Sequence, residues 1–250
     1  MKAPNLRLVA KSLLGRTPFY PVHIGGYTRQ LYFWKELVRL PVKEFRRVLD
    51  AGCGAGYYAR DLATRYRHLE VVGLDVELGR AVLSVELPAN LRFFQVDLRS
   101  LNDIGKYDFI YCIDVLDDVL EYEAILTRFH NALCSRGYLW IHLPLHPRRI
   151  QLVNHQAISD YLELDHRASV ADFISEEVVA SVLRASGFTI LRTYYTFGYS
   201  ATLAWELDRI LDKYLVLKIA LMPLLRTMAR LDVVLSNKRG NSFAILCRKE

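Results

Sequence analysis

Three glycines at alternating positions are the first residues of this sequence whose spacing indicates chemistry. They lie in Asp50-Ala-Gly-Cys-Gly-Ala-Gly56, which follows a short apolar run and precedes a stretch of helical periodicity. Glycine lets the backbone approach a ligand closely because no side chain blocks the contact. The spacing is not the G-x-G-x-x-G of dinucleotide-binding turns, since that pattern needs glycine where this chain has Tyr57. A tight turn that binds nothing is the alternative interpretation.

Two aspartates follow the glycines in order, each at the end of an apolar run. Asp75 closes a run in which an acid can accept hydrogen bonds from both hydroxyls of a ribose. Asp97 closes the next run, where it can bind the amine of an adenine ring while Leu98 packs on that ring. Each acid also has a simpler interpretation, because Asp75 can cap a helix that starts at Val76 and Asp97 can cap a loop.

Acids and histidines after two further apolar runs are candidates for moving a proton. Asp114, Asp117 and Asp118 follow the fourth run, and His142 and His146 lie at the end of the fifth and just beyond it. Ligands of open α/β sheets bind at the carboxyl ends of the strands. A neutral imidazole near pH 7 can take a proton from a hydroxyl group. The alternatives are acids that favour the dipole of the following helix and histidines that bind backbone groups.

Composition and charge limit the class of protein. With 250 residues, 52% of them hydrophobic and 24% charged, the chain can form one large domain or a domain with a modest cap. The formal net charge is +6, but the basic residues are scattered, so nucleic-acid binding is not indicated. No run reaches the roughly 18 apolar residues of a membrane span, and charges interrupt the apolar runs that a signal peptide would need. The four cysteines form no CxxC pair, as expected for reduced thiols of a cytoplasmic protein.

Short apolar runs alternate with stretches of helical periodicity from about residue 46 onward. This alternation is typical of a sheet with helices on both faces. The runs predict strands at 47–51, 71–75, 91–96, 107–113, 137–143, 188–197 and 242–248. The stretches predict helices at 57–66, 121–133 and 175–187, the last with Ser175 at its N-cap position. The final strand has no helix immediately before it, so it can run antiparallel to its neighbours.

Two segments interrupt the alternation, at about 144–173 and 199–237. We expect them to be insertions that cap a substrate site, because extra segments on α/β folds gather around the ligand. His155 and His166 in the first insertion can face that site.

Five segments occur in order along the chain: Val48-Leu-Asp-Ala-Gly-Cys-Gly-Ala-Gly56, Val72-Gly-Leu-Asp75, Gln95-Val-Asp97, Tyr107-Asp-Phe-Ile-Tyr-Cys112 and Cys134-Ser-Arg-Gly-Tyr-Leu-Trp140. Together they resemble class I S-adenosylmethionine (SAM)-dependent methyltransferases, and within that superfamily the small-molecule group called type 11. The resemblance implies an α/β, Rossmann-like class I methyltransferase sheet over 46–250, with seven mostly parallel strands and the last one antiparallel. It also implies that residues 1–45 form a helical lid over the cofactor.

The resemblance implies SAM as the cofactor and positions for each part of it. The glycines of the turn are expected beside the methionine part, Asp75 at the ribose, and Asp97 and Leu98 at the adenine. Tyr27 or Arg29 of the lid can reach the SAM carboxylate. The positions expected to bind the cofactor are Asp50, Gly52, Cys53, Gly54, Gly56, Asp75, Val76, Asp97, Leu98 and Ile113.

Methyl transfer from a sulfonium needs an aligned acceptor and a group that manages one proton. We expect His146, Asp114 and His142 to be the catalytic candidates, His146 first because it lies beyond Pro144, outside the strand. The expected acceptor is a small molecule, with a hydroxyl of a hydrophobic, lipid-like or glycosylated metabolite favoured over N- or C-methylation.

A divalent cation is the open question beside these candidates. Quinone-precursor O-methyltransferases hold such a cation with Glu-x-x-Glu-His, where this chain has Asp114, Asp117 and Asp118. Three carboxylates suit Mg²⁺ or Ca²⁺. The shorter acids and the missing histidine favour a helix cap, so no metal site is assigned.

Two other functions compete with methyl transfer. An NAD-dependent oxidoreductase is disfavoured by Tyr57 and by the absence of a Tyr-x-x-x-Lys pair. A non-catalytic protein that binds SAM and acts as a partner in a complex is the other alternative. No oligomeric state is predicted.

Residues 213–230 form an unusually apolar stretch with basic side chains spread through it. One interpretation is a pair of helices, broken at Pro223, that buries its apolar face on the domain. The other is a surface for peripheral contact with a membrane, or with an isoprenoid or acyl substrate, because a basic amphipathic helix suits an anionic interface.

Overall fold

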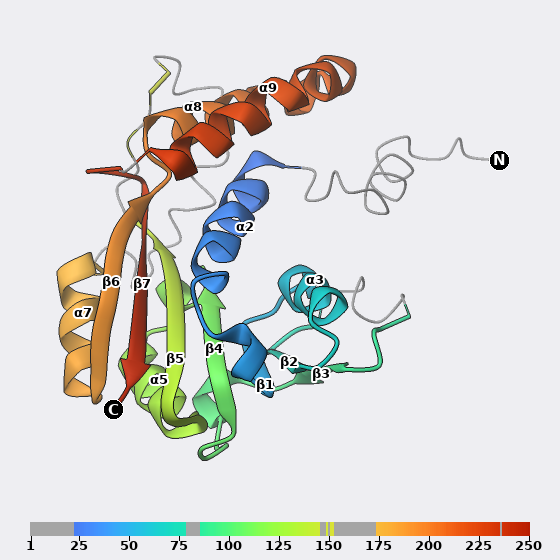
Figure 1. The fold of residues 1–250 in the computed structure, drawn as a ribbon. Coiled ribbons are helices and arrows are strands. Elements are labelled where there is room, and N and C mark those ends of the chain that lie inside the picture. The colour runs from blue at the N-terminus through green and yellow to red at the C-terminus, as the bar shows by residue number, and fades with distance from the viewer. Residues whose placement is uncertain (1–22, 79–85, 146–148, 150, 153–173, 236) are drawn as a thin grey trace. The chain divides into compact units, whose positions relative to one another are not determined.

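A seven-stranded sheet is the main feature of the fold (Figure 1). The computed structural model describes residues 23–78, 86–145, 149, 151, 152, 174–235 and 237–250. The strands are β1 (Arg47–Ala51), β2 (Glu70–Asp75), β3 (Leu91–Gln95), β4 (Tyr107–Ile113), β5 (Leu133–Pro144), β6 (Phe188–Thr196) and β7 (Ser242–Lys249). They are ordered β3-β2-β1-β4-β5-β7-β6. Strands β1 to β5 pair in parallel and β7 runs antiparallel to β5, which confirms the predicted Rossmann-like class.

The helices that follow these strands lie close to their predicted bounds. They are α3 (Tyr57–Arg65), α5 (Tyr122–Ala132) and α7 (Glu176–Ala185). At the start of α7 the Ser175 hydroxyl accepts a hydrogen bond from the backbone N–H of Val178, as its N-cap position predicted. One strand differs, because β5 begins at Leu133 rather than at 137. Arg136 has a left-handed φ of 64° and the pairing with β4 shifts register there, so no apolar alternation marks this part of β5.

The chain divides into two compact units. The larger unit comprises Pro41–Pro147, Ala168–Tyr195 and Ser242–Glu250, and it carries the sheet. The smaller unit comprises Met1–Leu40, Arg148–Arg167 and Thr196–Asn241. Of the described residues, 23–40 of the predicted lid and all of those in the second predicted insertion therefore belong to the smaller unit. Their roles as lid and cap stay predictions.

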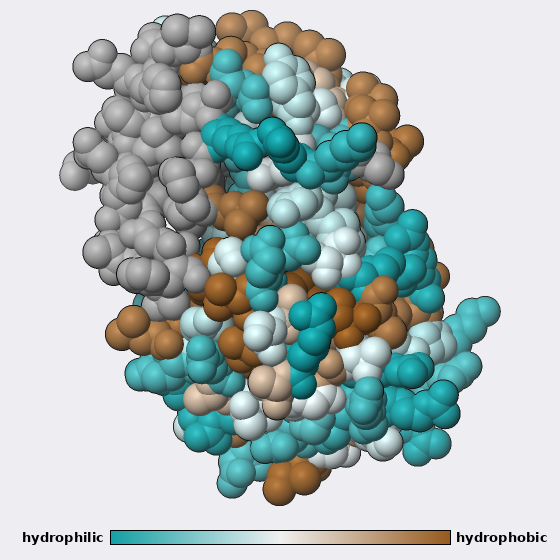
Figure 2. Space-filling view, turned by 90° about the vertical axis from the view of Figure 1, so that its left-hand side faces the viewer, coloured by the Kyte–Doolittle hydropathy of each residue, from teal (hydrophilic) through white to brown (hydrophobic). Residues whose placement is uncertain are grey.

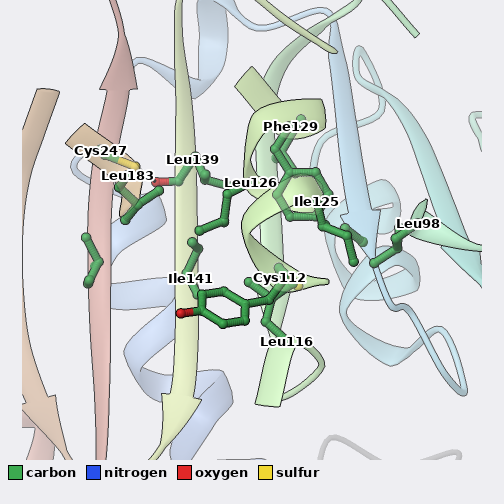
Figure 3. Close-up of a cluster of buried hydrophobic side chains, with 14 of the residues drawn as sticks. Leu98, Cys112, Leu116, Ile125, Leu126, Phe129, Leu139, Ile141, Leu183 and Cys247 are labelled. Atoms are coloured by element: carbon green, nitrogen blue, oxygen red, sulfur yellow. Dashed lines mark hydrogen bonds between the residues drawn. The ribbon is translucent and has the colours of Figure 1, made fainter. Parts of the chain in front are cut away.

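The core of the larger unit lies between the sheet, α5 and α7 (Figure 3). Leu126 of α5 points toward Leu139 and Ile141 of β5, and Leu183 of α7 belongs to the same cluster. All of these side chains are fully buried. Burying each stabilises the fold by roughly 1.5–3 kcal/mol relative to exposure, so the strands are held firmly. The four cysteines are free thiols.

The smaller unit is built on helices α2 (Ile24–Leu37), α8 (Tyr199–Ile210) and α9 (Leu215–Val234). Its apolar cluster includes Ile24, Ala204 and Leu225, one from each helix. Helices α8 and α9 occupy most of the second predicted insertion, 199–237. None of the helices that the structure describes is long and apolar enough to cross a bilayer.

The predicted break at Pro223 is wrong, because α9 continues through this residue without interruption. Proline removes one backbone hydrogen bond, here on the exposed side of the helix. The Thr227 hydroxyl donates to the Pro223 carbonyl at 2.9 Å, and Leu225 and Ala229 beyond it are buried in the cluster. This packing holds the second half of the helix in line. The helical conformation is interrupted earlier, at Tyr214, which precedes the first residue of α9.

A buried carboxylate connects the elements of the smaller unit. Asp232 of α9 is 1% exposed, and five residues donate hydrogen bonds to its side chain. The donors are the Tyr32 hydroxyl at 2.8 Å, the Gly198 N–H at 3.1 Å, the Ser200 hydroxyl at 3.1 Å, the Ala201 N–H at 3.1 Å and the Asn237 amide at 3.0 Å. Asp232 thereby joins α9 to α2 and to the first turn of α8.

We expect Asp232→Ala to lower the free energy of unfolding by at least about 2 kcal/mol, since it leaves the N–H groups of Gly198 and Ala201 buried without their acceptor. Urea denaturation followed by circular dichroism measures this. Ser200→Ala is the matched control, because it removes one donor and leaves the carboxylate bonded, at a cost of about 1 kcal/mol. Equal stability of Asp232→Ala and the wild type would contradict this role.

Candidate active site

The glycine turn after β1 has a left-handed backbone at all three glycines. The φ angles of Gly52, Gly54 and Gly56 are +80°, +49° and +70°. Side chains are strained in this conformation, so each position favours glycine. At Gly52 a side chain is also excluded by packing, because a Cβ there would lie 2.2 Å from Cγ2 of Val115.

The end of β2 holds the turn through three hydrogen bonds. The Leu74 carbonyl accepts from the N–H groups of Gly52 at 2.8 Å and Cys53 at 2.9 Å. Oδ2 of Asp75 accepts from the Gly54 N–H at 2.7 Å. Because β1 and β2 are parallel neighbours, their carboxyl ends meet and make these contacts possible. The backbone of the turn is therefore fixed relative to the Asp75 carboxylate.

Gly54 borders open space. No heavy atom of the described residues outside its immediate neighbours lies within 4 Å of the position that a Cβ on Gly54 would take. Gly52, by contrast, is closely packed. A ligand atom can therefore contact the backbone at Gly54 directly.

Asp75 has hydrogen-bonding capacity beyond its contacts with the turn. Its Oδ1 accepts from the Glu77 N–H at 3.0 Å, so each carboxylate oxygen has one backbone donor. A carboxylate oxygen can accept more than one hydrogen bond, which leaves room for ribose hydroxyls. Val76 beside it is 59% exposed and offers an apolar surface. Ribose binding by Asp75 stays a prediction, and its capping of the following turn is present.

Asp97 and Leu98 have structural contacts of their own. Asp97 caps the short helix η2 (Leu98–Ser100) by accepting from the Arg99 N–H at 2.8 Å. Hydrogen bonds from Arg99 hold the pKa of the Asp97 carboxyl below its usual range. Leu98 is 5% exposed and belongs to the core cluster (Figure 3). Asp97 therefore acts as a cap, as its simpler interpretation predicted. Contact of Asp97 and Leu98 with adenine stays a prediction.

Asp50 is a buried acid at the end of β1. Burial raises its pKa to about 7, an effect that hydrogen bonds from the Tyr111 hydroxyl and the Ala59 N–H reduce and the charge of Asp75 increases. Tyr111 stands directly opposite Asp50 in the register of β1 and β4. Asp50 therefore changes its protonation near neutral pH, unlike an exposed aspartate.

Cys53 and Ile113 complete the predicted cofactor-binding set. Cys53 is 8% exposed, and burial raises the pKa of its thiol, so it stays protonated at neutral pH. Ile113 is the last residue of β4 and is half-buried. Neither side chain carries charge, so both would contact a ligand mainly through van der Waals interactions.

Asp114 and His142 form a pair at the carboxyl ends of β4 and β5. Nδ1 of His142 lies 2.6 Å from Oδ1 of Asp114, and the Asp114 N–H donates to the His142 carbonyl at 2.9 Å. Asp114 has a left-handed φ of 51°, which is uncommon for a residue with a side chain. The His142 ring is fully buried, whereas the Asp114 side chain is 20% exposed. The ring binds a carboxylate rather than only backbone groups, and Asp114 is the member that a ligand can reach.

Five further residues belong to the predicted site. His146, His155 and His166 lie outside the described residues. Asp117 and Asp118 lie in the short helix η3 (Leu116–Asp118). Within the described ranges, no group of three histidine, cysteine or acidic residues is arranged to hold a metal ion.

Tyr27 and Arg29 of α2 have contacts within the smaller unit. The Tyr27 hydroxyl accepts from Nε of Arg230 at 2.8 Å, and the Arg29 guanidinium lies 5.9 Å from the centre of the Phe197 ring. Contact of either residue with the SAM carboxylate stays a prediction.

Two residues of the site were missed in the sequence. Val115 packs against Gly52, and no spacing or composition indicates that contact. Tyr111 donates a hydrogen bond to Asp50. This contact follows from the register of β1 and β4, which the sequence does not show.

These residues gather where the order of the strands reverses. The first strand, β1, lies between β2 and β4, and ligands of open α/β sheets bind beyond the carboxyl ends of the strands at such a point. The fold, the G-x-G-x-G turn and the acid that ends β2 define a class I SAM-dependent methyltransferase.

A comparison with protein families agrees with this class. The family model described as "Methyltransferase domain" matches residues 27–193, which is more than half of the chain. The chain belongs to this methyltransferase-domain family. The alternative of an NAD-dependent oxidoreductase is thereby set aside.

Curated relatives are similar to part of the chain. Trans-aconitate 2-methyltransferase of Methylobacterium nodulans is 30% identical over 108 residues, which cover 43% of this chain and 42% of the relative. Ubiquinone biosynthesis O-methyltransferase of Acinetobacter baylyi is 31% identical over 104 residues, covering 38% of this chain and 42% of the relative. The matches thus span about two fifths of these relatives.

Solved structures share the fold. Phosphoethanolamine N-methyltransferase 2 of Haemonchus contortus, in complex with phosphomonomethylethanolamine and S-adenosylhomocysteine, superposes with a TM-score of 0.64 at 19% identity. The superposition covers 97% of this chain and 57% of that one. At this identity the likeness concerns the fold alone.

The residues present fit SAM as the cofactor. The open space at Gly54 admits a ligand beside the backbone, and the Asp75 oxygens can accept further hydrogen bonds. An uncharged apolar surface follows at Val76.

We expect Gly54→Ala to weaken SAM binding at least about tenfold, because the new methyl group occupies the open space beside the backbone. Isothermal titration with SAM and with S-adenosylhomocysteine measures this. Gly105→Ala is a matched control, since Gly105 has a φ of +56° and equally open surroundings outside the turn. Both variants carry the same backbone strain, so unchanged affinity in both would argue against a cofactor at Gly54.

The raised pKa of Asp50 predicts a pH-dependent stability. The folded state keeps this proton up to a pH of about 7, whereas the unfolded chain releases it near the ordinary value of 3.8. As pH rises from about 4 to 7, the wild type therefore loses up to about 4 kcal/mol of unfolding free energy through this group, and no more above 7. Asp50→Asn lacks this loss. Urea denaturation at several pH values tests the difference, and parallel profiles of the two proteins would refute the assignment.

Proposed function

We propose that this SAM-dependent methyltransferase methylates a hydroxyl group of a small hydrophobic metabolite, lipid-like or glycosylated, and that Asp114 accepts the hydroxyl proton. The observation that carries the proposal is the Asp114–His142 pair at the carboxyl ends of β4 and β5. These strand ends belong to the same edge of the sheet as the glycine turn.

The geometry of Asp114 supports its role as the proton acceptor. Its carboxylate is partly exposed, and its backbone is held in a left-handed conformation by the hydrogen bond to the His142 carbonyl. Unusual backbone conformations of this kind cluster at functional sites. Because the Asp114 side chain is 20% exposed, a hydroxyl group can reach its carboxylate.

His142 is a positioning residue in this proposal. Its ring is fully buried, so it does not touch the acceptor, but its Nδ1 holds one oxygen of Asp114. With a proton on Nδ1, the ring donates a hydrogen bond to the carboxylate and orients it. His146 stays a second predicted proton acceptor and lies outside the described residues.

Methyl transfer to a hydroxyl group requires two contributions from the protein, which are a proton acceptor and the alignment of the reacting atoms. Bound SAM supplies a methyl group that is already activated for transfer to a nucleophilic oxygen. Asp114 takes up the proton that the hydroxyl loses, a contribution of about 10²–10⁴ in rate for general bases. The fixed glycine turn and the Asp114 segment limit the movement of what they bind, which aligns the reacting atoms.

The named relatives and the exposed surface of α9 support a small, hydrophobic acceptor. Two relatives are named for methylation of trans-aconitate and for ubiquinone biosynthesis, both small molecules. A lipid-like acceptor and peripheral contact with a membrane through 213–230 are supported by exposed apolar side chains of α9.

We expect Asp114→Asn to lower methyl transfer about 10²- to 10⁴-fold with unchanged affinity for SAM. Radiolabelled SAM incubated with fractionated cell extracts identifies an acceptor and then measures the rate, and isothermal titration measures the affinity. His142→Asn keeps a neutral donor toward Asp114, so its loss should be smaller.

Asp118→Asn is the matched control, because Asp118 is an exposed acid of the same segment. Transfer by Asp114→Asn at the wild-type rate would exclude Asp114 as the proton acceptor. Tight SAM binding by the wild type without transfer to any fraction would instead favour the non-catalytic alternative.

A further inference from the structure

Helix α9 turns three of its four charged side chains inward and several apolar side chains outward. Lys218, Arg226 and Asp232 are only 6%, 7% and 1% exposed. Val216 and Val234, near the two ends of the helix, are 83% and 79% exposed. A helix that faces water normally shows the opposite arrangement.

The inward charges are held by other groups of the smaller unit. Nζ of Lys218 lies 2.8 Å from Asp208 and 2.6 Å from Asp212, and five donors surround the Asp232 carboxylate as described above. The Arg226 guanidinium lies 4.9 Å from the centre of the Tyr27 ring. These contacts determine which side of α9 faces outward.

Six apolar side chains lie on the outward side, which we name the apolar face of α9. With 3.6 residues per turn, they fall within an arc of about 160° of the helix. They are Val216, Leu217, Ile219, Leu224, Leu231 and Val234, each 49% to 83% exposed. Figure 2 shows hydrophobic surface at its upper end, at the height at which Figure 1 draws α8 and α9. Contiguous exposed apolar patches mark sites of interaction with membranes, ligands or other proteins.

The exposed charged side chains from Lys213 to Arg239 are all basic. Between Lys213 and Leu235 the only acid is Asp232, which is buried, whereas Lys213 and Arg230 are exposed. The exposed pair Lys238-Arg239 follows the helix. A surface with apolar side chains inside a basic rim is complementary to the phosphate and hydrocarbon layers at the edge of an anionic bilayer.

We propose that the apolar face of α9 docks onto an anionic lipid bilayer, with α9 lying in the interface and the basic rim contacting lipid phosphates. The charges disfavour two other occupants. A second copy would bring an identical basic rim against this one. Residues 1–22 carry four basic residues and no acid, so they too would be repelled from the rim and attracted to the bilayer.

Co-sedimentation of the full chain with vesicles tests the proposal without SAM, so its outcome is independent of methyl transfer. We expect at least about tenfold more binding to vesicles containing phosphatidylglycerol than to phosphatidylcholine alone, and weaker binding at high salt. The double variant Val216→Asp, Val234→Asp should reduce binding at least about tenfold. Lys213→Gln should reduce it about fivefold.

Ile104→Asp is the matched control, since Ile104 is a 75% exposed apolar residue of the larger unit. It should bind vesicles like the wild type, and circular dichroism verifies that all variants keep their helices. Three results would overturn the proposal: no binding of the wild type to anionic vesicles, an equal loss in Ile104→Asp, or a wild-type dimer that only the double variant dissociates. The last result, seen by light scattering, would assign the face to a second copy.

Discussion

The hydrogen bonds between the glycine turn and the end of β2 are the constraint on which the rest of the site depends. The Leu74 carbonyl and the Asp75 carboxylate together bind three consecutive N–H groups of the turn. These bonds hold Gly52 and Gly54 in a left-handed conformation that an ordinary residue would resist. The ligand then meets backbone that is already ordered, so binding costs little conformational entropy.

The same turn is linked to the segment that carries the proposed proton acceptor. Val115 follows Asp114 directly and packs where a side chain on Gly52 would otherwise stand. Gly52 therefore serves the close packing of two loops, whereas Gly54 faces open space. The buried His142 ring holds Asp114 from β5, and the core beneath β4 and β5 keeps both strand ends in register. Cofactor site and proton acceptor are thus parts of one packed arrangement.

The stability of the smaller unit depends on how its buried charges are compensated. Several of its charged side chains are buried, and charge burial is unfavourable unless partners compensate it. Asp208 and Asp212 compensate Lys218, and five hydrogen-bond donors compensate Asp232. Because these polar contacts lie on the inner side of α9, apolar residues remain on its outer side. That arrangement is what makes α9 a candidate for contact with lipid.

The sequence by itself determined most of the strands and the family, because apolar periodicity and glycine spacing are local properties of the chain. The reversal of β7 was implied by the resemblance to that family. The sequence also indicated Asp75, Asp114 and His142 as residues at strand ends. Only the tertiary structure decided what those residues contact, since the Asp114–His142 pair depends on the register of β4 and β5. The path of α9 through Pro223 and the direction of its faces were likewise decided by tertiary packing, because buried partners outweigh the local preference of proline to end a helix.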